Sequence, residues 1–544
     1  MVDREPVYIT GHQHPDTDSV VSAIAYAFFK RARDGIRAVP CRLGELNHET
    51  EYLLKRFGFE VPELLEDARK TLSEIELDAP ESITPEMSML ETVRRMDETE
   101  RPSFAVVDQN QKVIGLVSKS DLANIALRDT ASEIELLKQT DIYHIAESIN
   151  GTILYDEKET HVNGKVSIIS LSTQKTANYD VRDRIVIIGD DPESQLALIR
   201  GGAGILIIVW AENVREEVLE EAKKYHCPII RSGHGSMNTS RYLYLAPPVK
   251  LIMRKPEVFR VTDLAEEAGK KFMKTRIRSY PVLDAEDRLC GYLHRYHIMN
   301  YRNKKIILVD HNEFSQSVKA IEKAQILEVI DHHRINDFAT TQPVSFRNEI
   351  VGSTATIVTT MFRENQIPLP ENLAGLLLGA VLSDTLNYQS PTTTRKDREV
   401  GNILAAVANL DQEEFARDIF TAAADEFDRP VSSMIRQDIK YYEINGCHTM
   451  ISQALVSSLS LIPPKEKEIQ EQMNVLAQKK ELDLLAAAFT SVIDNGSVMF
   501  FAGEKAQAAL EAFPNREGET HSFQEGILSR KSQILPKIEE ALGN

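Results

Sequence analysis

The chain has 544 residues, which is too long for one ordinary hydrophobic core and indicates three or four domains. Its formal net charge of -19 repels nucleic-acid backbones and argues against a general DNA- or RNA-binding protein. Charged residues make up 27% of the chain, and no apolar run reaches the roughly 18 residues that span a membrane, so no membrane partner is expected. The first residues enter a strand without a signal peptide, which predicts a cytoplasmic protein.

Strands and helices alternate at the start of the chain and again after residue 302, a pattern that predicts a parallel sheet. In chain order the expected elements are a strand at 7–10, a helix from Ser19 to about Arg33, a strand near 36–39, a helix near 48–57, strands at 306–309 and 326–330, a helix from Ser353 and an apolar helix at 373–382. Residues 1–65 and 303–430 are therefore expected to form one interrupted α/β domain, because a fold tolerates an insertion whose two ends lie close together. A final domain is expected at 431–544.

The inserted segment contains a duplicated module. Its two copies share matching residues at a constant offset of 176: Ser103-Phe104, Val106, Asp108 and Gly115 recur as Ser279-Tyr280, Val282, Asp284 and Gly291. Self-similarity of this kind marks a repeated structural unit. The copies, at 66–127 and 246–302, resemble CBS domains. The unit between them, at 128–245, is expected to be a small α/β domain and resembles a DRTGG domain, because an apolar strand there ends in Gly189-Asp190.

Acids and imidazoles follow apolar segments at four places in the interrupted domain. The four clusters are His12 to Asp18, Asp310 to Glu313, Asp331-His332-His333, and Ser383-Asp384. Ligand sites of open parallel sheets lie beyond the carboxyl ends of the strands, so the clusters could meet in one crevice. A plainer interpretation stays open for each cluster: Asp16 and Asp18 could be turn or helix N-cap residues, and a single histidine is more often a satisfied polar group. Four clusters at element ends favour a shared site.

Six residues of these clusters offer two imidazoles and four carboxylates. They are His12, Asp16, Asp18, Asp310, His332 and Asp384. This set of nitrogen and oxygen ligands suits Mn, Co, Fe or Zn rather than thiophilic metals. Acids gathered in one crevice could neutralise two divalent cations, which would lower the pKa of bound water from about 15.7 to about 7 and clamp the leaving oxygens of a substrate. The clusters therefore predict metal-dependent hydrolysis.

The sequence around these residues resembles the DHH phosphoesterase superfamily, and Ser529-Arg530-Lys531 near the C-terminus narrows the resemblance to family II inorganic pyrophosphatases. The order of the segments is similar to that of the regulated members, which carry a CBS pair and a DRTGG insert. The resemblance implies a multidomain α/β protein, in which a parallel-sheet DHH domain is interrupted by a CBS–DRTGG–CBS insert and followed by a C-terminal α/β substrate-binding domain. It also implies an inorganic diphosphatase that hydrolyses pyrophosphate to two orthophosphates.

Carried over by position, the resemblance implies a role for each candidate residue. His12, Asp16 and Asp310 would hold one Mn²⁺ or Co²⁺ ion, and Asp18, Asp310, His332 and Asp384 would hold the second, with Mg²⁺ bound to the substrate. His333 would face the substrate, and Lys440, Arg530 and Lys531 would bind its phosphates. A lone lysine in a helix is usually solvated, which leaves the role of Lys440 open. His14 stands where the family more usually has asparagine, so its role is open too.

The CBS resemblance implies adenine nucleotides as regulators: AMP or ADP would inhibit, and ATP or diadenosine polyphosphates would activate. The ligand would bind in the cleft between the copies, and a homodimer is expected. The candidate nucleotide contacts are Ser118, Asp121, Arg276, Arg278 and Tyr280. A solvated basic strand edge is the alternative for the last three. The second copy has His294 and His297 in place of Ser118 and Asp121, so the two half-sites need not be equal.

Two other functions fit parts of the sequence. Other DHH phosphoesterases act on oligonucleotides, cyclic dinucleotides or polyphosphate, but they generally end in a domain with a glycine-rich nucleic-acid motif, and no such run follows residue 430. A nucleotide-sensing protein with an inert catalytic half would show lost metal ligands, and none of the six is missing. Pyrophosphate hydrolysis under nucleotide control is therefore the leading hypothesis.

Overall fold

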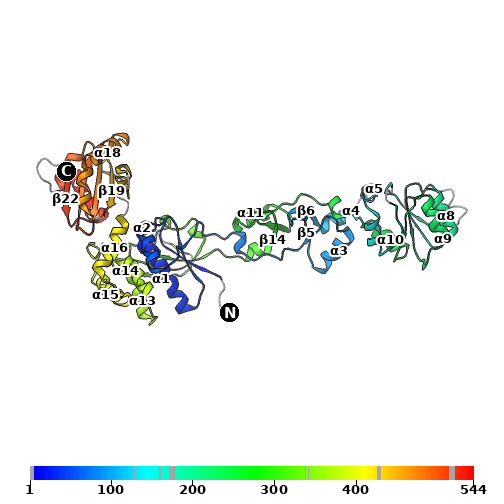
Figure 1. Ribbon diagram of the computed structural model, residues 1–544, viewed down its shortest axis with the longest axis horizontal. Helices are drawn as coiled ribbons and strands as arrows, with labels where there is room; N and C mark the ends of the chain where they lie inside the picture. Colours follow the sequence, from blue (N-terminus) through cyan, green and yellow to red (C-terminus); the bar gives the residue numbers. More distant parts are fainter. Residues whose placement is uncertain are drawn as a thin grey trace. The chain divides into compact units, whose positions relative to one another are not determined.

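The computed structural model describes residues 5–126, 130–157, 161–170, 179–336, 339–340, 342–424, 430–456, 458–513 and 521–543. The chain forms two compact units, whose elements are labelled in Figure 1. The first unit comprises Met1–Arg69 and Arg302–Asn544, and the second comprises Lys70–Tyr301. We call the second unit the insert.

A six-stranded sheet forms the core of the first unit, and all its strand pairs are parallel, as predicted. Its strands, in their order across the sheet, are β17 (Ser345–Asn348), β16 (Gln325–Asp331), β15 (Lys305–Val309), β1 (Val7–Thr10), β2 (Ala38–Arg42) and β3 (Glu63–Leu64). β1 pairs with β15, so strands from the two sides of the insert lie next to each other at the centre of the sheet. β2 begins at Ala38, two residues later than predicted.

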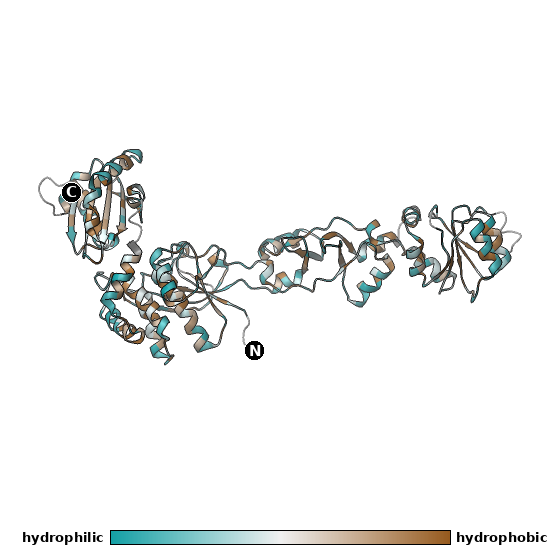
Figure 2. Ribbon diagram, in the orientation of Figure 1, coloured by the Kyte–Doolittle hydropathy of each residue, from teal (hydrophilic) through white to brown (hydrophobic). Residues whose placement is uncertain are grey.

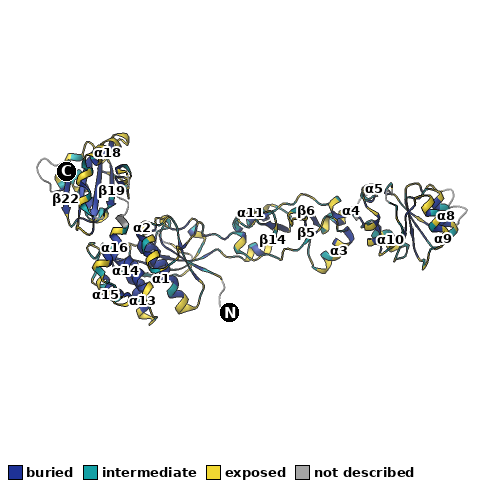
Figure 3. Cartoon of the chain, viewed as in Figure 1, coloured by how far each residue is buried: buried dark blue, intermediate teal, exposed yellow. Residues whose placement is uncertain are grey.

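Capping residues in the sequence set the ends of the helices around this sheet. α1 (Thr17–Asp34) follows Asp16, whose side chain accepts a hydrogen bond from the Ser19 backbone N–H, and it ends before Gly35, which has a left-handed φ of 65°. α14 (Glu371–Asp384) is buried from Leu373 to Leu382, as expected of a helix that is apolar on all sides. The apolar segments in Figure 2 are largely the buried segments in Figure 3. The other helices are α2 (His48–Phe57), α13 (Thr354–Glu364), α15 (Arg395–Ala408) and α16 (Gln412–Ala424).

The sequence repeat in the insert is also a structural repeat. The first copy contains β4 (Ser82–Ile83), α3 (Met89–Glu98), β5 (Ser103–Val107), β6 (Val113–Ser118) and α4 (Lys119–Ala126). The second contains β12 (Phe259–Arg260), α11 (Ala265–Lys274), β13 (Ser279–Leu283), β14 (Leu289–His294) and α12 (Arg295–Asn300). In each copy the first strand pair is parallel and the second is antiparallel. The register of the second pair shifts after Val106 and after Val282, which are equivalent positions.

The two copies are related by an approximate two-fold axis. Three isolated β-bridges obey the offset of 176 residues: Asp78 with Tyr292, Leu116 with Arg254, and Lys112 with Arg288. Residues 78 and 116 are equivalent to residues 254 and 292, so the first two bridges are copies of each other. The third bridge joins residue 112 to its own equivalent, residue 288. Reciprocal contacts of this kind are the signature of two-fold symmetry. Each copy therefore places a segment against the last strand of the other.

Between the copies lies a five-stranded sheet, which is parallel except for its edge strand β7. Its strands, in order, are β7 (Thr152–Tyr155), β11 (Ile229–Arg231), β10 (Ile205–Ile208), β9 (Ile185–Ile188) and β8 (Val166–Ile169). Its helices are α5 (Thr130–Lys138), α6 (Ile142–Ser148), α8 (Pro192–Arg200), α9 (Glu216–Lys224) and α10 (Ser236–Leu243). β9 and β10 are fully buried, because helices with apolar faces cover the sheet.

The last domain, which belongs to the first unit, has an α/β fold with its own sheet. Its sheet has the order β18 (Lys440–Ile444), β19 (Cys447–Leu455), β20 (Leu484–Ser491), β21 (Gly496–Ala502) and β22 (His521–Glu525). Its helices are α17 (Val431–Met434), α18 (Glu466–Lys479), α19 (Ala506–Ala512) and α20 (Leu535–Gly543). Lys440 begins β18, so its placement in a helix was wrong. Across the described residues, no helix is both long enough and apolar enough to cross a membrane.

Packing between α14 and α2 depends on the absence of side chains at two glycines. A Cβ atom at Gly375 would lie 2.2 Å from the ring of Phe57, and one at Gly379 would lie 2.8 Å from Leu53. Overpacking at Gly375→Ala should cost about 1–3 kcal/mol and the gain in helix propensity is about 1 kcal/mol, so the free energy of unfolding should fall by up to about 2 kcal/mol. Denaturant unfolding measures the change. Gly189→Ala, where a Cβ meets nothing within 4 Å, is the control and should be nearly neutral.

Candidate metal centre

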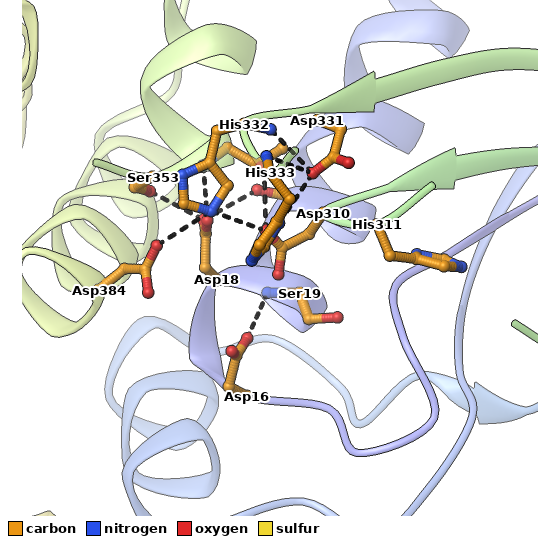
Figure 4. Close-up of polar contacts among 12 residues, drawn as sticks. Asp16, Asp18, Ser19, Asp310, His311, Asp331, His332, His333, Ser353 and Asp384 are labelled. Carbon is orange, nitrogen blue, oxygen red and sulfur yellow. Dashed lines mark hydrogen bonds and ion pairs between the residues drawn. The ribbon is translucent and has the colours of Figure 1, made fainter. Parts of the chain in front are cut away.

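The predicted ligands meet at the carboxyl edge of the parallel sheet. Figure 4 shows Asp16, Asp18, Asp310, His332 and Asp384 there. β1, β15 and β16 each lead into a candidate ligand, and the ends of two helices supply the others. Their ligand atoms form overlapping groups, in each of which all atoms lie within 4.8 Å of one another: His12, Asp16 and Asp310; Asp18, His332 and Asp384; and Asp310, His332 and His333. The structure thus brings all six residues together, although hundreds of positions separate them in the sequence.

Asp310 links these groups. Its side chain is 2% exposed, and its two oxygens face different histidines: Oδ1 lies 3.4 Å from His332 Nε2, and Oδ2 lies 3.6 Å from His12 Nε2. The φ of Asp310 is 62°, in the left-handed region that residues other than glycine rarely adopt. Local backbone strain of this kind is typical of functional sites. Asp310 is therefore placed to serve two ligand groups at once.

Two further observations show that these ligand atoms suit a divalent cation. His332 Nδ1 lies 3.0 Å from the carbonyl oxygen of Val351, so the neutral ring donates from Nδ1 and keeps a lone pair on Nε2. Nε2 faces carboxylate oxygens of Asp310 and Asp384. Asp384 Oδ2 is buried and has no hydrogen-bond partner. A cation satisfies all of these atoms, and a backbone partner on the second ring nitrogen is typical of metal-binding histidines.

The carboxylates repel one another strongly. Burial and the neighbouring Asp310 raise the pKa of Asp18, and burial and Asp18 raise the pKa of Asp384. Burial lowers the pKa of His332, but hydrogen bonding to Asp310 and the charge of Asp384 raise it well above its ordinary value. A proton and a cation therefore compete for His332 Nε2, and a bound cation would displace the proton.

The N-terminus of α13 compensates part of this charge. Asp18 Oδ1 accepts hydrogen bonds from Ser353 Oγ and the Ala355 backbone N–H, each at 2.9 Å, and Oδ2 accepts one from the Thr354 backbone N–H at 2.6 Å. Thr354 Oγ1 also donates to Asp310 Oδ1 at 3.0 Å. The helix that begins near Ser353 was predicted, but its hydrogen bonds to Asp18 and Asp310 were not. A capping residue does not reveal which carboxylate its helix faces.

Asp331 is a second residue whose role was missed. It is fully buried, and its Oδ1 accepts hydrogen bonds from the backbone N–H groups of His332 and His333 and from His333 Nδ1 at 2.9 Å. Asn312 donates to its Oδ2. The side chain of His333 is 44% exposed, so Asp331 fixes the ring and leaves Nε2 available on the exposed side. Its position directly before two histidines was the only signal in the sequence.

A cavity of about 930 Å³ opens beside His333. His332, Ser383 and Asp384 line one side, and Gln437, Asp438, Gln453, Ser529 and Lys531 from the last domain line another. Lys531 also lines an adjoining cavity of about 350 Å³ with His12, His333 and Arg334. The pair of cavities could hold a small phosphorylated substrate between the ligand cluster and Lys531.

The other predicted phosphate contacts are placed differently. Arg530 pairs with Asp438 at 2.6 Å between Nη1 and Oδ2, and its side chain is only 12% exposed. Lys440 is exposed at the start of β18 and lies outside both cavities. His14 is exposed on the loop between His12 and Asp16. Of the three basic residues, the structure brings only Lys531 to the cavities beside the ligand cluster.

The predicted nucleotide contacts fall into two places in the insert. Ser118 donates to Asp121 at 2.6 Å in the first copy, whereas Arg278 lines a cavity beside His294 in the second. Arg276 is exposed. Tyr280 is fully buried: its ring packs against Phe259 and Phe272, and its hydroxyl bonds to Thr275. The prediction that Tyr280 contacts a base is therefore wrong, because β13 is buried along its whole length.

Comparison with known proteins agrees with this architecture. The model of the DHH family N-terminal domain matches residues 6–381, and the model of the DHHA2 domain matches residues 417–541. Fold and ligand cluster thus define a DHH-family protein with a DHHA2 domain. The chain is 33% identical over 542 residues to the cobalt-dependent inorganic pyrophosphatase of Clostridium perfringens, covering 99% of both chains. It belongs to the family II inorganic pyrophosphatases of the DHH superfamily.

Other relatives match shorter or more distant parts. The manganese-dependent inorganic pyrophosphatase of Bacillus subtilis is 35% identical over 237 residues, covering 44% of this chain and 77% of that protein. A crystal structure of the CBS and DRTGG domains of the regulatory region of Clostridium perfringens pyrophosphatase, complexed with its activator diadenosine tetraphosphate, is 24% identical. It covers 41% of this chain and 99% of that chain, with a TM-score of 0.39.

Thr354 should position Asp310 for cation binding. Thr354→Val keeps the side-chain shape but removes the hydroxyl, so it should weaken Mn²⁺ or Co²⁺ affinity by roughly 10- to 100-fold, as is typical of groups that orient metal ligands. Thr354→Ser keeps the hydroxyl and is the matched control, with affinity near that of the wild type. Calorimetric titration of the metal-free protein measures both. Equal affinities of the two variants would contradict the role.

Proposed function

We propose that the chain is a manganese- or cobalt-dependent inorganic pyrophosphatase, which hydrolyses pyrophosphate to two orthophosphates. The observation that carries this proposal is the pair of histidine–carboxylate groups that share Asp310. A relative that matches 99% of this chain is named a cobalt-dependent inorganic pyrophosphatase, which supports the hydrolysis of pyrophosphate. The cavities beside His333 suit a substrate as small as pyrophosphate.

The six clustered residues would hold two ions. His12, Asp16 and Asp310 would hold one ion, and Asp18, Asp310, His332 and Asp384 would hold the other. Two Mn²⁺ or Co²⁺ ions bound there would supply Lewis-acid charge and lower the pKa of bound water, and Mg²⁺ would accompany the substrate. Nitrogen and oxygen ligands without thiolates suit these metals.

The remaining residues bind and orient the substrate. Asp331 Oδ1 accepts a hydrogen bond from His333 Nδ1, which fixes the ring. With the ring protonated, His333 would donate a second hydrogen bond, from Nε2 to a phosphate oxygen. Lys531 supplies positive charge from the opposite side of the cavity. Arg530 and Lys440 are assigned to the phosphates by their resemblance to the family, and Arg530 would have to exchange Asp438 for a phosphate oxygen. Orientation of this kind aligns the attack and reduces its entropic cost.

The insert regulates this reaction. AMP or ADP inhibits, ATP or diadenosine polyphosphates activate, and the protein is a cytoplasmic homodimer. The proposed domain boundaries are 1–65 and 303–430 for the DHH domain, 66–127 and 246–302 for the CBS copies, 128–245 for the DRTGG-like domain and 431–544 for the C-terminal domain. A nucleotide shifts activity only through its different affinities for two conformations, typically by about 1–3 kcal/mol. The effects on rate are therefore partial.

Asp310→Asn tests the proposed activity directly. The substitution keeps the size of the side chain but removes the charge that both ions share, so phosphate release from pyrophosphate should fall by well over the roughly 100-fold loss seen when only an orienting group is removed. The assay uses protein loaded with Mn²⁺ or Co²⁺ and follows phosphate colorimetrically. Asp190→Asn, an exposed residue of the insert, is the control. Near-normal hydrolysis by Asp310→Asn, or activity that survives chelation, would rule the proposal out.

Lys531→Ala should raise KM for pyrophosphate by roughly 10- to 100-fold, the usual worth of a hydrogen bond to a charged group. Metal content should stay unchanged, because Lys531 would meet phosphate and not metal. Steady-state kinetics and elemental analysis separate the two effects. Lys467→Ala, on the exposed face of α18, is the matched control. A loss of bound metal without a change in KM would assign Lys531 a structural role instead.

A further inference from the structure

The two copies in the insert carry different charges at equivalent positions. We define the first half-site as Ser118, Asp121 and Arg254. The offset of 176 residues relates these to the second half-site, which consists of His294, His297 and Asp78. A carboxylate on the helix faces a guanidinium from the other copy in the first half-site. In the second, imidazoles on and before the helix face a carboxylate from the other copy, so the charges are exchanged.

The first half-site pairs a carboxylate with a guanidinium. Asp121 Oδ2 accepts hydrogen bonds from the Ser118 backbone N–H at 2.9 Å and from Ser118 Oγ at 2.6 Å, and Arg254 Nε lies 3.3 Å away. None of the three side chains is an imidazole, the group that ordinarily changes charge near neutral pH.

The second half-site contains groups that can gain a proton. Asp78 Oδ2 lies 3.0 Å from His294 Nε2, Asp78 Oδ1 lies 3.5 Å from His297 Nε2, and the Tyr296 hydroxyl donates to Asp78 Oδ1 at 2.6 Å. His297 Nδ1 accepts a hydrogen bond from the His294 backbone N–H at 3.0 Å, which fixes the neutral tautomer of His297. Protonation of His297 would break this cap. His294 Nε2 faces the Asp78 carboxylate, so His294 is the better placed of the two rings to take up a proton.

His294 lines a cavity of about 550 Å³ whose walls come from both copies. The ionisable groups around it are Asp78, Glu81, Glu100, Arg101 and Arg278. Three carboxylates and two guanidiniums give the walls a negative balance while His294 is neutral. One proton on His294 brings the net charge of these walls from negative to zero. The proton thus decides whether a negatively charged ligand is repelled.

The groups that face His294 set the pH range of this change. Asp78 and a hydrogen bond to the backbone of Arg278 favour the protonated ring, whereas Arg101 and His297 disfavour it. Burial also disfavours it and is the largest effect, so the pKa of His294 lies below its ordinary value. Glu76, near His297, is the remaining nearby acid. Proton uptake therefore occurs as the pH falls from neutrality into the mildly acidic range.

We propose that Asp78, His294 and His297 make the second half-site a proton-dependent site for the phosphate group of a nucleotide, whereas Asp121 and Arg254 make the first half-site independent of pH. This inference rests on the nucleotide regulation proposed above and names the residues that make its two half-sites unequal. By linkage, a bound phosphate group would in turn favour the protonated form of His294.

The test is calorimetric titration of the full-length protein with AMP at about pH 5.5 and about pH 7.5. For each protein the measured quantity is the ratio of its AMP affinity at the lower pH to that at the higher pH. This ratio should be about fivefold larger for the wild type than for His294→Gln, an effect typical of one partly exposed charge pair. We call this fivefold difference the gain. AMP also titrates in this range, but its titration is common to both proteins and cancels in the ratio. The triple variant Asp78→Arg, His294→Ser and His297→Asp copies the first half-site onto the second and should also lose the gain.

Two controls make the result specific. Asp121→Asn changes the first half-site and should leave the gain intact, and adenosine, which lacks the phosphate, should show no gain with the wild type. Thermal melting checks that each variant is folded. An equal pH response of the wild type and both second-site variants, or the same gain with adenosine, would overturn the proton-dependent site alone. Absence of AMP binding to every protein at both pH values would overturn the proposed nucleotide regulation, and this inference with it.

Discussion

Repulsion among the carboxylates at the sheet edge is the constraint on which the first unit depends. Asp18 and Asp384 belong to one ligand group, and Asp310 and Asp384 both face His332, in a buried place where charge interactions are strengthened. The N-terminus of α13 and two histidines compensate part of this negative charge. Bound cations would compensate the rest. A cation that binds only the folded state also stabilises it. Folding and metal binding are therefore coupled at this edge.

The same constraint accounts for the order of the central strands. β15 lies between β1 and β16, so Asp310 emerges between His12 and His332, and each of its oxygens meets one histidine. The insert rejoins the sheet just before β15, and the Lys304 side chain donates a hydrogen bond to the Arg69 carbonyl, which ties the two connections together. Residues 302–304 and the five-residue strand β15 thus form the path from the end of the insert to Asp310. β15 is hydrogen-bonded to a strand on each side.

Much of the fold could be predicted from the sequence, because strand and helix periods and the offset of 176 residues are local or countable features. The candidate metal ligands could be selected from the sequence because their clusters follow apolar elements, and the structure brings them together. Their supporting contacts could not be found: Ser353 and Thr354 lie more than 330 positions from Asp18, and nothing local indicates that they meet. Tyr280 was misplaced because a strand buried on both faces has no polar alternation to show which side chains reach a ligand.

The duplicated module shows which features of a repeat are constrained. The two copies have the same helices, the same strand pairs and the same register shift, at Val106 and at Val282. Each copy needs the same backbone hydrogen bonds between its strands and the same apolar face in order to fold. The half-site residues do not contribute to those cores, and the two-fold axis brings each of them against a partner from the other copy. A change of charge on one helix can then be balanced by an opposite change on the other copy, as Asp121 with Arg254 and His294 with Asp78 illustrate. Duplication therefore preserved the backbone while leaving the two half-sites free to differ in charge.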